Sequence, residues 1–149
     1  GGIGDGRGVA AAFMLGAAGA QMGTRFLTAA ESEVHPNFKA KILKAKDIDT
    51  IVTGNLLGNR ARVLKNKMAK SFVKNEVNEL QKEKPDAEAI EKLESGTLKR
   101  AVQEGDKDGG AFMAGQISGL IHDEKPVAEI LEDIWAQATD LMGVENTTK

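Results

Sequence analysis

The chain opens with Gly1-Gly2-Ile3-Gly4-Asp5-Gly6-Arg7-Gly8, and one helix length later comes Gln21-Met22-Gly23-Thr24. Five of the first eight residues are glycine, which lets the backbone take positive φ angles and bring its N–H groups against a phosphate oxygen. The apolar, Ala-rich stretch 9–18 between the two segments predicts a short helix. The two glycine-bearing segments therefore predict a split binding site for an anion.

The residues after this helix have the length and composition of one strand. Segment 20–27 mixes apolar and polar residues, so we expect a strand with Gly23 and Thr24 near its end. In a (β/α)8 barrel, a phosphate commonly binds between the loops after strands seven and eight. The order of turn, helix and strand therefore predicts an α/β fold that begins near the end of strand seven of such a barrel.

Other common phosphate motifs do not fit. The pattern G-x-G-x-x-G fails because Arg7 and Val9 occupy the positions where the third glycine is required. The sequence contains no Gly-Lys-Ser or Gly-Lys-Thr, which excludes a P-loop. The alternative to a phosphate-binding turn is a flexible glycine-rich leader.

Several motifs together resemble one known family, the flavin-dependent enoyl-acyl-carrier-protein reductase II and nitronate monooxygenase enzymes. The resemblance runs to about Met142, so it covers almost the whole chain, and it is the combination of motifs that makes it specific. These motifs are Gly1-Gly2-Ile3 with Asp5-Gly6-Arg7-Gly8, Phe13-Met14-Leu15-Gly16-Ala17, Gln21-Met22-Gly23-Thr24-Arg25-Phe26, Glu31, His35-Pro36, Lys41-Ile42, Asp49-Thr50, Gly58, Arg62, Asn66, Gly105-Asp106, Gly109-Gly110, Met113-Ala114-Gly115-Gln116 and Gly119-Leu120-Ile121.

The resemblance implies an FMN enzyme on a TIM barrel with a mostly helical substrate-binding appendage, using NADH or NADPH as co-substrate. Six residues match the family's FMN phosphate motif: Gly1, Gly2, Gln21, Met22, Gly23 and Thr24. Their backbone N–H groups and the Thr24 hydroxyl would donate to the phosphate. Gly4 stands where the family often has alanine, which we expect to leave the site unchanged.

The length constrains this interpretation. A TIM barrel needs about 250 residues, and this chain has 149, so we expect the C-terminal part of the barrel, with the N-terminal half missing. In the family, the proposed catalytic histidine and most flavin contacts lie upstream. Neither His35 nor His122 matches that histidine, and the catalytic residues are therefore unknown.

Composition shifts divide the chain into three expected parts. Residues 1–34 would end the barrel and carry the phosphate-binding turns, 35–108 would form the helical substrate-binding part, and 109–149 would return to the barrel and end in a helix packed on it. Within these parts we expect a helix from Pro36, an extended segment at 47–53, one amphipathic helix over 61–82, and a last helix from Pro126 to Gly143 with Trp135 in the core.

The composition excludes several function classes. There is no cysteine, and the two histidines are far apart, so we expect no metal site. The net charge of −2 gives no reason to expect nucleic acid as a partner. No apolar run approaches the ~18 residues of a membrane span and no signal peptide is visible, so we expect a cytoplasmic protein.

A basic segment offers a candidate substrate surface. Between Asp49 and Glu76 the charged residues are all basic: Arg60, Arg62, Lys65, Lys67, Lys70 and Lys74. Such a segment would attract an acyl carrier protein or the phosphates of a nicotinamide dinucleotide, whereas the alternative is a solvated helix face. Arg62 lies in a stretch that resembles the family and is a candidate substrate-binding residue. Gln116, between Gly115 and Gly119, is a second candidate, with close helix packing as the alternative for those glycines.

Three functions stay open at this point. The first is an FMN-dependent reductase of enoyl-acyl-carrier-protein thioesters in fatty acid synthesis. The second is a nitronate monooxygenase that oxidises small alkyl nitronates with oxygen, and the third is an inactive or partner-dependent fragment. The Gly23-Thr24-Arg25-Phe26 motif, His35-Pro36 and the basic segment favour the reductase. Besides acyl carrier protein, a small-molecule substrate and a homodimer stay open.

Overall fold

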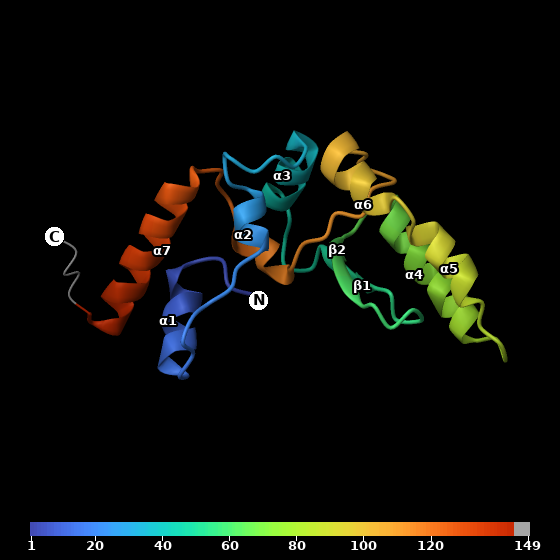
Figure 1. The fold of residues 1–149 in the computed structure, drawn as a ribbon, viewed down its shortest axis with the longest axis horizontal. Helices are drawn as coiled ribbons and strands as arrows, with labels where there is room; N and C mark the ends of the chain where they lie inside the picture. The colour runs from blue at the N-terminus through green and yellow to red at the C-terminus, as the bar shows by residue number, and fades with distance from the viewer. Residues whose placement is uncertain (145–149) are drawn as a thin grey trace.

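A computed structural model describes residues 1–144 of the chain. Figure 1 shows an elongated arch: helices α1 (Gly6–Met14) and α7 (Val127–Met142) form one end, and the β-hairpin with α4 (Lys67–Leu80) and α5 (Ala87–Glu94) forms the other. The short helix α2 (Thr24–Leu27) and helix α3 (Pro36–Leu43) lie between the two ends.

The first end is built on close contact between α1 and α7. Asp5 caps α1, since its side chain accepts a hydrogen bond from the Gly8 N–H, 3.2 Å away. Gly6 lies so close to α7 that a Cβ on it would fall 2.7 Å from the Ala138 backbone nitrogen. The apolar cluster between the helices contains Val9, Ala10, Ala29, Ile130, Ile134 and Ala138.

The strand expected at 20–27 was wrong. Residues 20–22 have no regular structure, and Thr24–Leu27 is the helix α2. Its hydrogen bonds are local: Phe26 N–H donates to the Gly23 carbonyl over 3.0 Å. A strand needs a neighbouring strand to satisfy its N–H and C=O groups, and within residues 1–144 no strand lies beside this segment.

The middle of the arch is organised by α3. His35 caps this helix, because its Nδ1 accepts the Asn37 N–H over 3.0 Å, and Pro36 is the first helical residue, as the sequence predicted. Phe38 and Ile42 are fully buried, and the Phe38 ring meets the Phe112 ring edge-on with 5.0 Å between centroids. The capping hydrogen bond confirms a structural role for His35.

The expected helix over 61–82 is correct only in its second part. Its first residues form strand β2 (Ala61–Leu64), which pairs antiparallel with β1 (Thr50–Thr53) so that Thr50 faces Leu64. Asn66 then starts α4, since its side-chain oxygen accepts the Ala69 N–H over 2.8 Å. The apolar spacing of 64–80 continues across this boundary, which is why periodicity alone predicted one helix.

The chain returns from the far end through short elements. After α5 come α6 (Thr97–Lys99), a π-helical turn (Arg100–Glu104) and the 3-10 helix η2 (Gln116–Leu120). Gly105 ends the π-helical turn with a φ of 60°, and a Cβ there would collide with the His35 ring. Glycine at 105 therefore allows this turn to pack on the start of α3.

The last helix has the predicted ends but a narrower buried face. Pro126 and Gly143 bound α7, and Ile130, Ile134 and Ala138 are buried at four-residue spacing. Trp135, expected in the core, is 50% exposed, because it lies on a second apolar face that α1 does not cover. Within residues 1–144, the only strands are the two antiparallel strands of the hairpin, so this part of the chain is dominated by helices and contains no parallel barrel strands. The three-part division stays a prediction.

Candidate functional site

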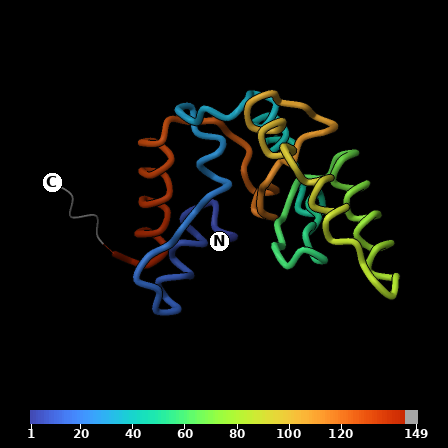
Figure 2. Tube along the Cα trace, turned by 45° about the vertical axis from the view of Figure 1, so that its right-hand side comes forward, coloured from blue at the N-terminus to red at the C-terminus, as the bar shows by residue number. Residues whose placement is uncertain are grey.

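The predicted phosphate-binding glycines at the start of the chain are open to solvent. Gly2 has a φ of 80°, which favours glycine, and a Cβ built on Gly1 or Gly2 would meet nothing within 4 Å. Figures 1 and 2 both place the N-terminus close to the segment that leads into α2. Ile3 and Met22 also pack against the same apolar cluster, so the structure brings the two predicted segments together.

The second predicted segment, residues 21–24, would offer mainly backbone groups to a phosphate. Gln21 and Gly23 are exposed, whereas Met22 is partly buried against the cluster between α1 and α7. A Cβ on Gly23 would meet nothing within 4 Å, so the space beside this turn is free. Gly23 directly precedes α2, whose first N–H groups have no partner within the helix.

Thr24 connects this turn to a distant segment. Its Oγ1 accepts a hydrogen bond from the Gly115 N–H over 3.0 Å. Because a hydroxyl has one donor and two acceptor positions, accepting this bond leaves the Thr24 O–H available to donate. The arrangement fixes the position of the hydroxyl without using its proton.

The segment around Gly115 runs from the predicted phosphate site to the hairpin. Its neighbour Ala114 donates its N–H to the Arg62 carbonyl over 3.1 Å, and Leu64 donates to the Phe112 carbonyl over 2.9 Å. Residues 112–114 thus lie alongside β2 while residue 115 holds Thr24. The predicted phosphate turn and strand β2, which carries the candidate residue Arg62, are therefore connected through the consecutive residues Ala114 and Gly115.

The two candidate substrate residues lie at this junction. Arg62 is partly buried on β2, where its Nη1 donates to the Thr50 hydroxyl over 3.0 Å. Gln116 is exposed and begins η2, directly after Gly115. Their roles in substrate binding stay predictions. Both residues are connected to Thr24 through one short segment, because Gly115 bonds Thr24, Ala114 bonds Arg62, and Gln116 follows Gly115.

The two glycines around Gln116 have different roles. Gly115 precedes η2 and is not a helix-interior residue, contrary to the expectation from its spacing. Gly119 lies within η2, and a Cβ there would fall 2.6 Å from the Asp47 backbone nitrogen. The close approach is to another part of the backbone, so the packing explanation holds for Gly119.

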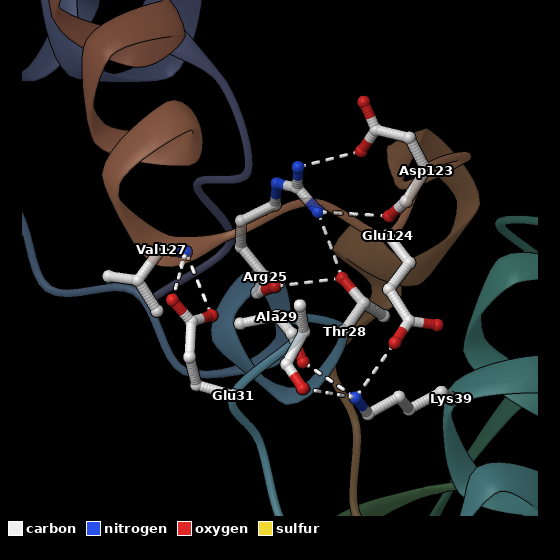
Figure 3. A network of polar contacts seen from close by, with 9 residues as sticks. Arg25, Thr28, Ala29, Glu31, Lys39, Asp123, Glu124 and Val127 are labelled. Carbon is white, nitrogen blue, oxygen red and sulfur yellow. Dashed lines mark hydrogen bonds and ion pairs between the residues drawn. The ribbon is translucent and has the colours of Figure 1, made fainter.

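The structure also shows a buried polar network that the sequence did not predict (Figure 3). Arg25 is 6% exposed; its guanidinium donates to the Thr28 hydroxyl over 2.9 Å and to the Asp123 carbonyl over 3.2 Å. Its Nη2 lies 2.6 Å from the Asp123 carboxylate. Arg25 therefore fastens the helix that follows Gly23 to the segment after η2.

Lys39 makes a second connection in the same network. Its ammonium donates to the Ala29 carbonyl over 2.7 Å and to the Glu124 carboxylate over 2.9 Å. Nearby, the Glu31 carboxylate accepts the Val127 N–H at the start of α7. Arg25 and Glu31 belong to the motifs quoted above, but their partners lie about a hundred residues away in the sequence. Spacing rules connect only residues that are close in sequence, so they could not predict these contacts.

The basic segment is only partly free. Lys67 pairs with Asp108 at 2.8 Å, and the ammonium of Lys65 donates to the Ile48 carbonyl at 2.6 Å. Arg60, Lys70 and Lys74 are exposed to solvent. The acidic neighbour Glu76 is instead buried and accepts the Leu56 N–H over 2.9 Å, which holds the hairpin loop to α4.

In residues 1–144, no three His, Cys, Asp or Glu side chains gather in a way that could hold a metal ion. In the same part of the chain, no helix is both long enough and apolar enough to span a membrane.

Comparison with known proteins identifies the family. The family described as nitronate monooxygenase (NMO) matches residues 1–137. The chain belongs to the nitronate monooxygenase family. Among curated members, it is 35% identical over 142 residues to a probable nitronate monooxygenase of Staphylococcus saprophyticus, and this match covers 95% of the chain and 38% of the relative.

Solved structures agree with this family assignment. FabK from Thermotoga maritima superposes with a TM-score of 0.88 at 47% identity, over 96% of this chain and 44% of that one. A nitroalkane oxidase from Streptomyces ansochromogenes superposes with a TM-score of 0.75 at 27% identity, over 96% of this chain and 39% of that one. The chain therefore spans about two-fifths of the length of these family members.

Proposed function

We propose that this chain supplies the phosphate-binding part of an FMN-dependent oxidoreductase, as the C-terminal portion of a (β/α)8 barrel. The observation that carries the proposal is the Thr24–Gly115 hydrogen bond beside the two open glycine segments. It leaves a hydroxyl donor and unobstructed backbone at the residues that match the family's FMN phosphate motif. Gly1, Gly2, Gln21, Met22, Gly23 and Thr24 would hold the FMN phosphate.

Each of these residues has a limited and separate task. The Thr24 hydroxyl would donate to a phosphate oxygen, and the N–H groups of the glycine turns would add further donors to the negative charge. Met22 positions its backbone by packing its side chain on the α1–α7 cluster. FMN, once bound, supplies hydride transfer from NADH or NADPH to the β-carbon of an enoyl thioester.

Sequence motifs support the order of the candidate functions. The Gly23-Thr24-Arg25-Phe26 motif and His35-Pro36 favour the reductase branch of the resemblance. We therefore propose reduction of an enoyl-acyl-carrier-protein thioester first, and oxidation of small alkyl nitronates second.

The two activities separate in one pair of assays. The protein that carries this chain, prepared with the segments its relatives have in addition, is given NADH or NADPH with crotonyl thioester, and separately propionate nitronate in oxygenated buffer. Oxidation of the nicotinamide that requires the thioester supports the reductase. Oxygen uptake that requires the nitronate, with no thioester-dependent oxidation, replaces it with the monooxygenase. If no preparation of the protein binds flavin, the result favours the non-catalytic fragment.

Arg62 is the substrate-binding residue to test. Arg62→Ala should raise KM for the thioester or the nicotinamide while FMN remains bound, because Arg62 lies on β2 and not at the phosphate turn. Arg62→Lys keeps the charge, and Lys84→Ala, at an exposed position between α4 and α5 and outside the basic segment, is the matched control. An unchanged KM for both substrates in Arg62→Ala would refute the assignment.

A further inference from the structure

A hollow on α3 gathers positive charge away from the FMN residues. It has a volume of about 410 Å³, and its wall combines an apolar floor with charged and polar residues: Asn37, Ala40, Lys41, Lys44, Ala45, Asp49, Leu64, Lys65 and Lys107. Four lysines thus face a single carboxylate. None of these residues belongs to the predicted phosphate turns, so this hollow is a separate site.

The four lysines come from three different parts of the chain. Lys41 lies in the last turn of α3 and Lys44 is the residue that ends this helix. Lys65 follows β2, and Lys107 lies in the turn after the π-helical segment. No run of basic residues in the sequence joins them, so the convergence is produced by folding. Like charges brought together in this way repel one another unless an anion lies between them.

Within residues 1–144, two of the four lysines have no protein partner for their charge. In the described part of the chain, neither Lys44 nor Lys107 has an ion-pair partner within 4.0 Å. The ammonium of Lys65 donates to the Ile48 carbonyl over 2.6 Å. The ammonium of Lys41 lies over the Phe112 ring, 5.2 Å from its centroid. Asp49, the one carboxylate of the wall, already accepts the Lys46 N–H over 2.9 Å.

Other hollows of the structure lack this character. The one between α7 and the segment after η2 contains Asp5, Asp123 and Asp133 in its wall. The one beside Phe13 and Trp135 is lined by apolar side chains. Among these hollows, the hollow on α3 is therefore the one whose charge selects an anion.

We propose that the hollow on α3 binds a small phosphorylated molecule, with its phosphate groups held by Lys41, Lys44, Lys65 and Lys107 and its less polar part against Ala40 and Leu64. An ammonium is a point-charge partner for phosphate and does not require the fixed geometry of arginine. The volume exceeds that of a single phosphate, and the apolar floor suits a compound such as a nucleoside diphosphate. Binding here does not depend on the proposed oxidoreductase activity.

The test is calorimetric titration with pyrophosphate and with ADP. It uses the protein that carries this chain, saturated with FMN so that the phosphate turns are occupied. We expect saturable binding of at least one of the two compounds, and Lys44→Gln/Lys107→Gln should weaken it by about tenfold, because two charge-assisted contacts are lost. Both side chains are exposed, so the double variant should fold normally.

The control separates a specific site from general attraction. Lys84→Gln/Lys99→Gln removes the same two charges from exposed positions that lie outside both the hollow and the basic segment, and it should leave the affinity unchanged. Lys44→Arg/Lys107→Arg should keep binding within a few-fold, because the charge is retained. Equal weakening by the two glutamine pairs, or no saturable binding of either compound, overturns the proposal. Weaker binding in Lys44→Gln/Lys107→Gln alone supports the proposal, whether or not the protein reduces enoyl thioesters.

Discussion

Thr24 accepts a hydrogen bond from Gly115, 91 residues further along the chain, over 3.0 Å. The residue before Gly115 is bonded to the Arg62 carbonyl, so one short segment touches both the phosphate turn and the hairpin. A change at Thr24 is therefore expected to affect cofactor binding and the position of β2 together.

Thr24→Val should lower FMN affinity by about tenfold and the free energy of unfolding by about 1 kcal/mol. Valine removes both the donor for phosphate and the acceptor for the Gly115 N–H, with little change in shape. Thr24→Ser keeps the hydroxyl and should retain both properties. FMN fluorescence titration and urea unfolding measure the two effects; a valine variant with unchanged FMN affinity would remove Thr24 from the site.

Gly6→Ala should destabilise the protein by about 2 kcal/mol. A Cβ at this position would lie 2.7 Å from both the Ala138 nitrogen and Gln137 Cβ, so α1 and α7 would have to move apart. The Gly6 N–H would also lose its 2.8 Å bond to Gln137 Oε1.

The matched control for this change is Gly19→Ala. A Cβ on Gly19 meets nothing within 4 Å, and its φ is not positive. Urea unfolding should give the same midpoint for this variant as for the unmodified protein. Equal stability of the Gly6 and Gly19 variants would contradict the close helix contact.

Arg25→Met should lower the free energy of unfolding by about 2–3 kcal/mol. Methionine keeps part of the buried volume but removes the charge-assisted bonds to Thr28 and Asp123. Asp123 is 49% exposed and stays hydrated after the change, so no larger penalty is expected. Arg60→Met, an exposed arginine on the hairpin, should unfold like the unmodified protein, and thermal unfolding of both variants provides the comparison.

Acid should remove the contribution of Asp5 to stability. Partial burial raises the pKa of Asp5, but hydrogen bonds from the Arg7 side chain and the Gly8 N–H outweigh it, so the net pKa lies below its ordinary value. A lowered pKa in the folded state means that the stabilisation is complete above the ordinary value of about 3.9 and is lost as the pH falls through the folded value.

Asp5→Asn tests this pH dependence. Asparagine still caps a helix but does not titrate. The difference in unfolding free energy between the two proteins should therefore be constant near neutral pH and shrink below about pH 4. A difference that stayed constant down to about pH 2 would show that the charge of Asp5 contributes nothing.

The sequence predicted elements whose signals are local. Pro36 and Gly143 mark helix ends through their own backbone preferences, and both ends were confirmed. The glycine segments of the proposed phosphate site are local signals of the same kind, and their role in binding stays a prediction. The family resemblance was confirmed as well, because it rests on motifs spread over most of the chain.

Features decided by distant partners were missed or wrong. The stretch 61–64 is a strand because β1 pairs with it, and its apolar spacing suits a helix equally well. Trp135 is half exposed because α1 packs on the neighbouring face of α7, which carries Ile130, Ile134 and Ala138. The Arg25–Asp123 pair joins segments 98 residues apart, and no spacing rule connects them.

The contact between α1 and α7 joins residues as far apart as Gly6 and Gln137, which are separated by 131 positions. During translation, at about 5–20 residues per second, α1 leaves the ribosome on the order of ten seconds before α7 is made. The apolar face with Val9 and Ala10 must wait uncovered for that time. Until α7 is made, this apolar face is therefore open to contact with other polypeptides, and slow codons placed before Val127 would lengthen that exposure.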